Sequence, residues 1–316
     1  MENNENIDKT ENNYKWIDNF KDVMNNYQYF IFDCDGIIWQ QDLYFSKVAK
    51  LLNDLKNSGK MLFFLTNSNA RSRLDIQQKL LTAGFESDFE FIYNAGYITA
   101  KSIKYNYPGI KHIYIIGTKG LTSEFEKLGF KVYDSSDDIN LHTEFEQLNL
   151  DEFTFNKDIQ AVCCGYDPSI NYYKILYALQ ILKNGCKLFG TNIDKFDKYK
   201  NIYIPGSFTV IASLEACGET KAQIYSKPSK LSFDLIMKDH NIPESEKDKC
   251  IMIGDNMNTD IMFGNNCMID TCLVFSGVTK LENYLKLTKE ELGKLGKPKY
   301  LLKNFDKYEW EVNCFV

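Results

Sequence analysis

Two aspartates near the N-terminus offer carboxylates two positions apart. Asp33 and Asp35 follow residues 29–32, an apolar run typical of a buried strand. Open α/β sheets bind ligands at the carboxyl ends of their strands. Because a buried carboxylate without a partner is costly, a pair at this place indicates a cation to hold or a proton to move. An Asx cap in an ordinary turn also explains such a pair, so its meaning depends on the rest of the chain.

A third carboxylate follows another apolar run, late in the chain. Gly254 and Asp255 end this run, and Asp260 lies on the short helix that we expect next. Glycine permits a close turn, which places Asp255 at the sheet edge where Asp33 and Asp35 emerge. Oxygen ligands with few nitrogens or thiols nearby select a hard cation. The three carboxylates at these two strand ends therefore predict a Mg²⁺ site.

Two further motifs supply positive charge and hydrogen-bond donors beside these acids. Thr66 and Asn67 end the apolar run 61–65, where a hydroxyl and the amides at a helix start suit a phosphate. Lys227 precedes Pro228, and a residue before proline favours extended backbone outside a helix. Each motif alone is also explained by an N-cap or a solvated lysine. Together with the acids, they describe a site that holds a phosphoryl group by metal, amides and ammonium.

The choice of nucleophile falls on a carboxylate. The sequence has neither a G-x-S-x-G motif nor a phosphate-binding P-loop. Its three histidines, His112, His142 and His240, are far apart. An aspartate can attack phosphorus to form an aspartyl-phosphate while a second carboxylate handles protons. The pair Asp33 and Asp35 supplies both parts.

The elements that must position these residues alternate between strand and helix along the chain. Apolar residues at helical spacing separate short apolar runs, which is typical of parallel sheets covered by helices on both faces. The fold class is therefore predicted to be α/β. The expected strands are residues 29–32, 61–65, 113–116, 161–164, 187–190, 251–253 and 271–275.

The spacing of the motifs predicts an inserted domain. The stretch between Asp35 and Thr66 is too short for one, whereas the stretch from Asn67 to Lys227 is long and contains two βαβ units. Its polar, acidic part at 134–157 is expected to be a surface excursion. The predicted organisation is a disordered lead-in at 1–14, a catalytic core at 15–97 and 203–316, and an inserted α/β domain at 98–202.

Composition excludes several classes of function. The chain has 316 residues, a net charge of −6 and no basic block, which argues against nucleic acid as a partner. Its nine cysteines form neither a disulfide framework nor a zinc spacing, and they are expected to be reduced, as in the cytoplasm. The start lacks the features of a signal peptide, and no apolar run is long enough to span a membrane.

Taken in their order along the chain, the four motifs resemble those of the haloacid dehalogenase superfamily. The sequence Asp-Cys-Asp-Gly-Ile-Ile-Trp at 33–39 is similar to its 4-nitrophenylphosphatase branch, which includes phosphoglycolate phosphatase and pyridoxal phosphate phosphatase. Shorter strings at 190–192, 205–207 and 227–229 agree with this branch. The resemblance covers roughly residues 29–278 and implies a core of Rossmann type with the larger, C2-type α/β cap inserted into it.

The resemblance also implies roles for the two aspartates and for the phosphate-binding residues. Asp33 would be the nucleophile, and Asp35 would be the general acid and base. Thr66 and the Asn67 amide would hold the phosphoryl oxygens, and Lys227 would neutralise charge on the phosphoryl group and the nucleophile.

The metal would be Mg²⁺, held by Asp33, Asp255 and the backbone carbonyl of Asp35. Asp260 would lie behind these ligands in the outer shell. Asn258 stands where relatives often carry aspartate, which makes the outer shell less acidic.

The expected function is a Mg²⁺-dependent phosphomonoesterase that acts on small metabolites, with phosphoglycolate as the first choice. Pyridoxal phosphate phosphatase and a broad sugar or nucleotide phosphatase are the alternatives within the enzyme class. A phospho-aspartate receiver module and a silent binding protein are the alternatives outside it. The second Asp of the pair and the inserted domain argue against a receiver.

Substrate selection is expected to come from the inserted domain, because the core recognises only phosphate. The candidate is the loop 194–203, whose cations could meet a second anionic group on the substrate. A solvated lysine-rich turn explains the same loop equally well. The resemblance further implies a homodimer formed through the cap. The residues of the loop that carry the hypothesis are Lys195, Lys198, Tyr199 and Lys200.

Overall fold

The computed structural model describes residues 14–134, 150–151 and 153–308. The chain divides into two compact units, the first with residues 1–64, 83–85 and 242–316, and the second with residues 65–82 and 86–241. Of the predicted lead-in, only residue 14 is described. Most of the predicted acidic excursion, at 135–149 and 152, also lies outside the described residues. The predicted insertion at 98–202 falls inside the second unit, and its boundaries stay a prediction.

The first unit is built on a parallel sheet with the strand order β1-β16-β15-β14-β2-β5. Every neighbouring pair in this order is parallel, as the α/β prediction requires. The central strands are almost entirely buried, which explains why they are continuous apolar runs rather than alternating ones. The strands are β1 (Lys15–Trp16), β2 (Tyr29–Phe32), β5 (Met61–Thr66), β14 (Cys250–Gly254), β15 (Asp270–Val274) and β16 (Tyr300–Leu302).

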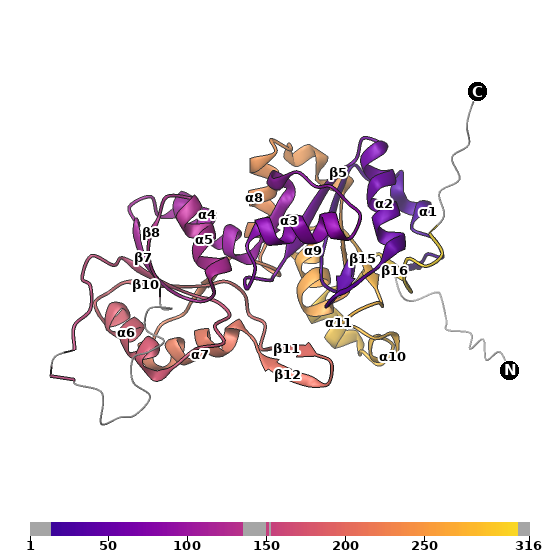
Figure 1. Cartoon of the computed structure of the whole chain (residues 1–316). Helices are drawn as coiled ribbons and strands as arrows, with labels where there is room; N and C mark the ends of the chain where they lie inside the picture. The colour runs from indigo at the N-terminus through magenta and orange to yellow at the C-terminus, as the bar shows by residue number, and fades with distance from the viewer. Residues whose placement is uncertain (1–13, 135–149, 152, 309–316) are drawn as a thin grey trace. The chain divides into compact units, whose positions relative to one another are not determined.

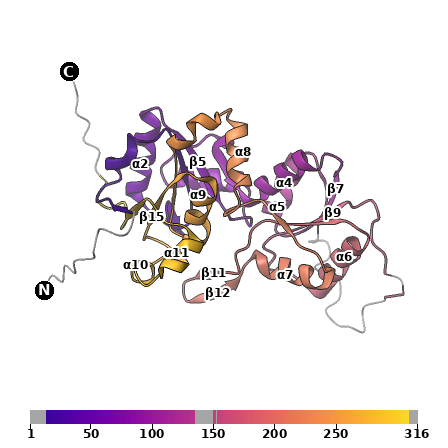
Figure 2. The same cartoon turned by 180° about the vertical axis from the view of Figure 1, so that it is seen from behind.

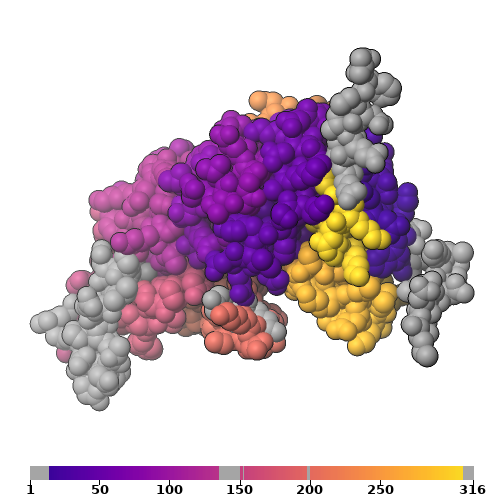
Figure 3. All heavy atoms as spheres, turned by 45° about the vertical axis from the view of Figure 1, so that its right-hand side comes forward, coloured from indigo at the N-terminus to yellow at the C-terminus, as the bar shows by residue number. Residues whose placement is uncertain are grey.

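Helices and a small hairpin complete this unit. Strand β1 pairs with β16, so the indigo N-terminal strand lies beside the yellow C-terminal part of the chain in Figure 3. Helix α2 buries Val48, Leu51, Leu52 and Leu55, the stripe that its helical spacing predicts. The remaining elements are α1 (Lys21–Met24), the hairpin β3 (Trp39–Gln40) and β4 (Leu43–Tyr44), α2 (Ser46–Asn57), the 3₁₀ helix Glu244–Lys249, α9 (Met262–Cys267), α10 (Leu281–Tyr284) and α11 (Lys289–Leu295).

The helix expected at 259–265 differs from the prediction. It begins as a π-helical turn at Met257–Ile261, and α9 follows it. The carbonyl oxygen of Asn256 accepts from the backbone N–H of both Asp260, at 2.9 Å, and Ile261, at 3.3 Å, which widens the turn. Such π-turns occur often at functional sites, and this one begins two residues after Asp255.

The second unit has its own five-stranded parallel sheet, with the order β13-β10-β9-β7-β8. It confirms the predicted βαβ units of the middle of the chain. The unit begins with the last two residues of β5, Leu65 and Thr66. The strands of this sheet are β7 (His112–Ile116), β8 (Lys131–Asp134), β9 (Ala161–Cys164), β10 (Lys187–Gly190) and β13 (Gln223–Ile224). A further strand of the unit, β6 (Ile92–Asn94), lies outside this sheet.

Helices cover both faces of this sheet. Helices α4 and α5 lie side by side on one face, and α6 and α7 lie together on the other (Figures 1 and 2). The core under α6 and α7 is apolar and includes Val162, Ile181 and Ile211. The helices are α3 (Arg73–Thr82), α4 (Ala95–Asn106), α5 (Lys119–Lys127), α6 (Tyr172–Lys183), α7 (Ser207–Gly218) and α8 (Leu231–Asp239), with a 3₁₀ turn at Phe89–Phe91.

The segment expected as a loop at 194–203 is instead mostly a β-hairpin. Strands β11 (Phe196–Tyr199) and β12 (Ile202–Pro205) pair in antiparallel register and are joined by two residues. Lys200, the first of these, has a φ of 55°, as the tight turns of two-residue hairpins require. The prediction missed the hairpin because this turn lacks the usual Asn-Gly or Asp-Gly signal. The rings of Phe196 and Tyr203 meet edge to face at 5.2 Å across the strands.

Within the described part of the chain, no helix is both long and apolar enough to span a bilayer. All eight described cysteines are free thiols, as predicted.

Candidate active site

Two of the predicted acids emerge side by side at the carboxyl edge of the first sheet. Asp33 follows β2 and Asp255 follows β14, and these strands are parallel neighbours. The backbone N–H of Asp33 donates to the carbonyl of Ile253 at 2.9 Å, which continues the pairing up to the first aspartate. The sheet thus brings together two aspartates that are more than two hundred residues apart in sequence.

Asp260 joins these two residues to form a buried group that we call the acidic cluster: Asp33, Asp255 and Asp260. One carboxylate oxygen from each lies within 4.8 Å of the other two. Their side chains are buried, with exposed fractions of 8%, 2% and 0%. Three carboxylates at this distance repel one another, and burial strengthens the repulsion.

The acidic cluster fits a hard divalent cation on its donor set. The side-chain oxygens of the cluster are all carboxylate oxygens, and no histidine or cysteine belongs to the group found among the described residues. Oxygen-only sets of this kind suit Mg²⁺ or Ca²⁺ better than zinc or copper. A cation would also reduce the mutual repulsion of the buried acids, so these residues can hold a metal.

Asp255 is enclosed by backbone. A Cβ atom added to Gly36 would lie 2.4 Å from Asp255 Oδ2, and one added to Gly277 would lie 1.7 Å from it. The backbone N–H of Val278 donates a short hydrogen bond to the same oxygen. Gly36 also has a φ of 84°, a conformation that other residues rarely adopt. Only glycine at 36 and 277 lets two chain segments reach this carboxylate.

The segment 276–279 was missed by the sequence analysis. Ser276 Oγ donates to the carbonyl of Gly36 at 2.5 Å, and the N–H of Thr279 donates to the carbonyl of Asp255 at 2.9 Å. The segment therefore joins the loop that carries Gly36 to the loop that carries Asp255. The available signal was a glycine soon after the strand predicted at 271–275.

Asp260 organises the turn after β14. Its Oδ2 accepts from the backbone N–H of Asp255 at 3.1 Å and of Asn256 at 3.0 Å. A Cβ atom on Gly254 would lie 2.2 Å from its Cγ, so Gly254 is needed for this approach. Asp260 thus holds the turn that carries Asp255 by two amides, and its place behind the metal ligands stays a prediction.

The side chain of Asp35 does not belong to the acidic cluster. It is exposed, and its Oδ1 accepts from the indole Nε1 of Trp39 at 2.8 Å. Its carboxylate is not one of the three that the structure groups within the described residues. The hydrogen bond from Trp39 orients this carboxylate, and its exposure gives it access to water.

The phosphate-binding candidates Thr66, Asn67 and Lys227 belong to the second unit. Thr66 Oγ1 accepts from the N–H of Ser68 at 3.0 Å. Asn67 Nδ2 donates to the carbonyl of Lys227 at 3.0 Å, so residues from two distant motifs are in contact. Thr66 and Lys227 are buried, with exposed fractions of 3% and 1%.

The loop between β5 and α3, residues 67–72, is held by neighbours that sequence reasoning did not assign. Asn192 Nδ2 donates to the carbonyl of Asn67 at 2.8 Å. Asp194 Oδ2 is 3.4 Å from Asn67 Nδ2. The Oδ1 atom of Asn67 is buried and has no hydrogen-bond partner among the described residues, which leaves one acceptor in the loop for a donor.

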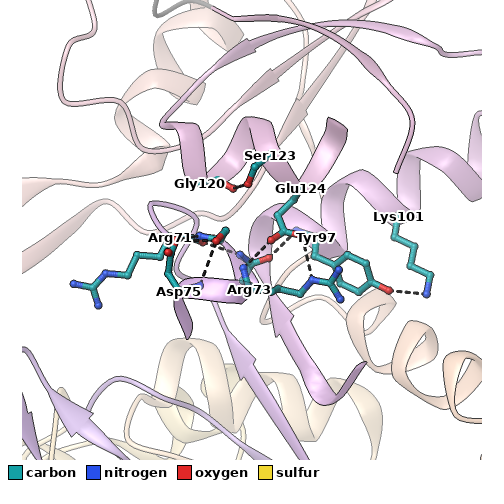
Figure 4. Close-up of polar contacts among 10 residues, drawn as sticks. Arg71, Arg73, Asp75, Tyr97, Lys101, Gly120, Ser123 and Glu124 are labelled. Carbon is teal, nitrogen blue, oxygen red and sulfur yellow. Dashed lines mark hydrogen bonds and ion pairs between the residues drawn. The ribbon is translucent and has the colours of Figure 1, made fainter. Parts of the chain in front are cut away.

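The far end of this loop is anchored at Arg73, the first residue of α3. Glu124 of α5 accepts from the backbone N–H of Arg73 at 2.7 Å and from its Nε at 3.1 Å (Figure 4). The guanidinium carbon lies 3.4 Å from the ring centre of Tyr97. Both members of the ion pair are buried, so the contact fixes where α3 begins.

Comparisons with known proteins show which proteins this chain is similar to. A model of haloacid dehalogenase-like hydrolases matches residues 30–131, and a second HAD-hydrolase-like model matches residues 224–307. The chain is 31% identical to phosphoglycolate phosphatase 2 of Arabidopsis thaliana over 274 residues, which cover 84% of this chain and 89% of that protein. It is 29% identical to glycerol-3-phosphate phosphatase of Mus musculus, over 80% of each chain.

The fold is also similar to that of solved structures. A p-nitrophenyl phosphatase from Archaeoglobus fulgidus superposes with a TM-score of 0.74 at 22% identity, over 88% of this chain and 97% of that one. A 4-nitrophenylphosphatase from Thermotoga maritima has a TM-score of 0.73 at 25% identity, over 90% and 96%.

Proposed function

The chain belongs to the haloacid dehalogenase-like hydrolases, and we propose that it is a Mg²⁺-dependent phosphomonoesterase of small metabolites. The observation that carries the proposal is the acidic cluster, in which a carboxylate oxygen of Asp33, after β2, lies within 4.8 Å of one from Asp255. A metal-binding group of carboxylates around a strand-end aspartate suits transfer of a phosphoryl group to that aspartate.

In the proposed reaction, a carboxylate oxygen of Asp33 attacks phosphorus. The bond from phosphorus to the substrate oxygen breaks, and Asp35 gives its proton to that leaving oxygen. Asp35 then takes a proton from water, whose oxygen attacks the phosphorus of the aspartyl-phosphate. The acyl–phosphate bond breaks, inorganic phosphate leaves and the Asp33 carboxylate is restored. The exposure of Asp35 and its hydrogen bond from Trp39 support this role.

The remaining residues bind and orient the phosphoryl group. Thr66 and the Asn67 amide hold phosphoryl oxygens, and Lys227 neutralises their charge together with that of Asp33. Asp33, Asp255 and the backbone carbonyl of Asp35 would hold the Mg²⁺, which would lower the electrostatic cost of bringing an anionic phosphate to a carboxylate.

Phosphoglycolate is the proposed first substrate. Support comes from the Arabidopsis phosphoglycolate phosphatase relatives, to which the chain is 31% identical. Glycerol-3-phosphate is the second candidate, because relatives of that name are 29% identical. We propose that the hairpin β11–β12, with exposed Lys195 and Lys200, meets the second polar group of the substrate.

Three predictions from the sequence accompany this proposal. They are an inserted cap at 98–202, a homodimer formed through that cap, and a cytoplasmic location.

The deciding experiment measures hydrolysis of 4-nitrophenyl phosphate with Mg²⁺ by the wild type and by Asp33→Asn. Removing the nucleophile should lower kcat by about a thousandfold or more. Asp22→Asn, which changes an exposed aspartate on α1, is the matched control and should leave kcat unchanged. Near-normal turnover by Asp33→Asn would end the covalent mechanism. A panel with phosphoglycolate, glycerol-3-phosphate and pyridoxal phosphate then ranks the substrates by kcat/KM.

A further inference from the structure

Asn69 is a buried residue of the β5–α3 loop that the proposed reaction does not use. Its exposed fraction is 3%. Its side chain is satisfied at both ends: Oδ1 accepts from the backbone N–H of Tyr166 at 2.7 Å, and Nδ2 donates to Ser207 Oγ at 2.9 Å. The two partners are 97 and 138 residues away in sequence. A buried amide with partners at both ends has one favoured orientation.

The partner on the β9 side is itself fixed. Tyr166 follows Gly165, whose N–H donates to the carbonyl of Ile116 at 2.8 Å. A Cβ atom on Gly165 would lie 2.5 Å from Asn69 Oδ1, so only glycine at this position allows the two segments of the chain to approach each other. Directly after Tyr166, Asp167 pairs with Lys174.

That ion pair makes the turn after β9 rigid. Lys174 Nζ lies 2.8 Å from Asp167 Oδ2, and both side chains are 1% exposed. Breaking a buried pair of this kind is costly, so the turn keeps one conformation. The second partner, Ser207, is buried at the start of α7. Asn69 therefore ties the loop to two well-fixed points.

Thr66 and Asn69 are close along the chain, so the hydrogen bonds of Asn69 also restrict the residues between them. Strand β5 fixes the loop at Thr66, and Asn69 fixes it three positions later, with only Asn67 and Ser68 between. Thr118 Oγ1 also donates to the carbonyl of the next residue, Ala70, at 3.0 Å. The loop has little freedom to place its hydroxyl and amide anywhere else.

We infer that Asn69 is a positioning residue for phosphoryl binding. By tying the β5–α3 loop to β9 and α7, it sets where the Thr66 hydroxyl and the Asn67 amide meet the phosphoryl oxygens. The inference rests on the proposed function, since it assumes that these two residues bind phosphate. In the proposed reaction Asn69 touches no reacting atom, so it is not a catalytic residue.

The test replaces Asn69 by leucine, which has similar volume and removes both hydrogen bonds. A misplaced loop should lower kcat/KM for 4-nitrophenyl phosphate by about 10- to 100-fold. It should raise the inhibition constant of inorganic phosphate by a similar factor, because the same groups bind the product. A purely structural role would lower the melting temperature and leave both constants, measured on folded protein, unchanged.

Asn53→Leu is the matched control. Asn53 Nδ2 donates to the carbonyls of Ala49 at 2.8 Å and Gly84 at 3.0 Å, so it is a structural asparagine of the first unit. Its replacement should lower stability without changing the phosphate inhibition constant. Ser207→Ala removes one of the two bonds of Asn69 and should raise that constant by a smaller factor. In the Asn69→Leu background it should add nothing, as expected for two residues that share one contact.

Two outcomes overturn the inference. One is an Asn69→Leu enzyme whose phosphate inhibition constant and kcat/KM stay close to those of the wild type. The other, which decides if Asn69→Leu does not fold, is a Ser207→Ala enzyme with an unchanged inhibition constant. The proposed function is judged separately by Asp33→Asn. Loss of turnover in that variant, together with normal phosphate inhibition of Asn69→Leu, refutes the positioning role alone.

Discussion

A Cβ atom on Gly277 would lie 1.7 Å from Asp255 Oδ2, closer than any side chain can approach. The backbone of Gly277 therefore packs directly against the carboxylate of Asp255, the candidate metal ligand. The adjacent N–H of Val278 donates to the same oxygen. This contact orients the carboxylate, so residue 277 controls the geometry of Asp255 without being a ligand.

Gly277→Ala should displace Asp255 and impair the enzyme. The added methyl group cannot fit unless the carboxylate moves, and a displacement of about 1 Å can lower a rate about a hundredfold. We expect kcat for 4-nitrophenyl phosphate to fall by that order, with a higher Mg²⁺ concentration at half-maximal rate. Gly293→Ala is the control, because a Cβ atom at Gly293 in α11 meets nothing within 4 Å. Equal activity of the two variants would contradict the assignment.

Metal removal should affect both rate and stability. Chelation should stop turnover, and Mg²⁺ should raise the melting temperature, because a ligand at 100 times its Kd stabilises the folded state by about 2.7 kcal/mol. Asp255→Asn should abolish most of this rise. Asp248→Asn, which changes an exposed aspartate before β14, should retain it. Differential scanning fluorimetry with and without Mg²⁺ provides the comparison, and turnover that survives chelation would remove the metal from the mechanism.

Glu124→Ala should destabilise the protein strongly. The change removes the partner of the buried Arg73 guanidinium and the acceptor of its backbone N–H. Breaking a buried pair by removing one partner costs about 3–5 kcal/mol. The stacking of Arg73 on Tyr97 keeps part of its environment. Urea unfolding measures the loss, and Glu126→Ala, an exposed position on the same helix, should stay close to the wild type.

Buried thiols should make the fold less stable in alkali. Burial raises the pKa of Cys250 to about 12 and also raises the pKa values of Cys163, Cys164 and Cys272. Above the ordinary thiol pKa of 9.0, the unfolded chain has lost these protons while the folded chain keeps them. The free energy of unfolding should therefore decrease as the pH rises from 9 to about 12. Urea midpoints at pH 7 and pH 10 test the sign, and a higher midpoint at pH 10 would contradict it.

The same thiols should resist labelling in the native state. Thiolates are the reactive species, so a buried thiol with a raised pKa reacts slowly with Ellman's reagent at pH 8. Cys217 is exposed and should react quickly. Cys217→Ser should remove one equivalent of fast colour development. If this substitution removes none, Cys217 is not accessible to the reagent in the folded protein.

The sequence predicted the parts of the site that depend on local patterns. Apolar runs located β2 and β14, and the residues that follow them, Asp33 and Asp255, had to emerge at the same edge of a parallel sheet. The alternation of strand and helix likewise predicted both parallel sheets. These inferences needed only strand ends and a sheet in which all strands run the same way.

Tertiary structure decided which carboxylates and loops meet. Asp35 is two residues from Asp33, yet its side chain turns to Trp39, while Asp260 reaches the acidic cluster through a π-turn. The sequence has no periodic signal for the close approach of Gly277 to Asp255, or for the hydrogen bond from Tyr166 to Asn69. Both depend on close approach between segments far apart in sequence. Hydrophobic periodicity fixes which face of an element is buried, but the partner that a single polar side chain finds depends on how whole elements pack.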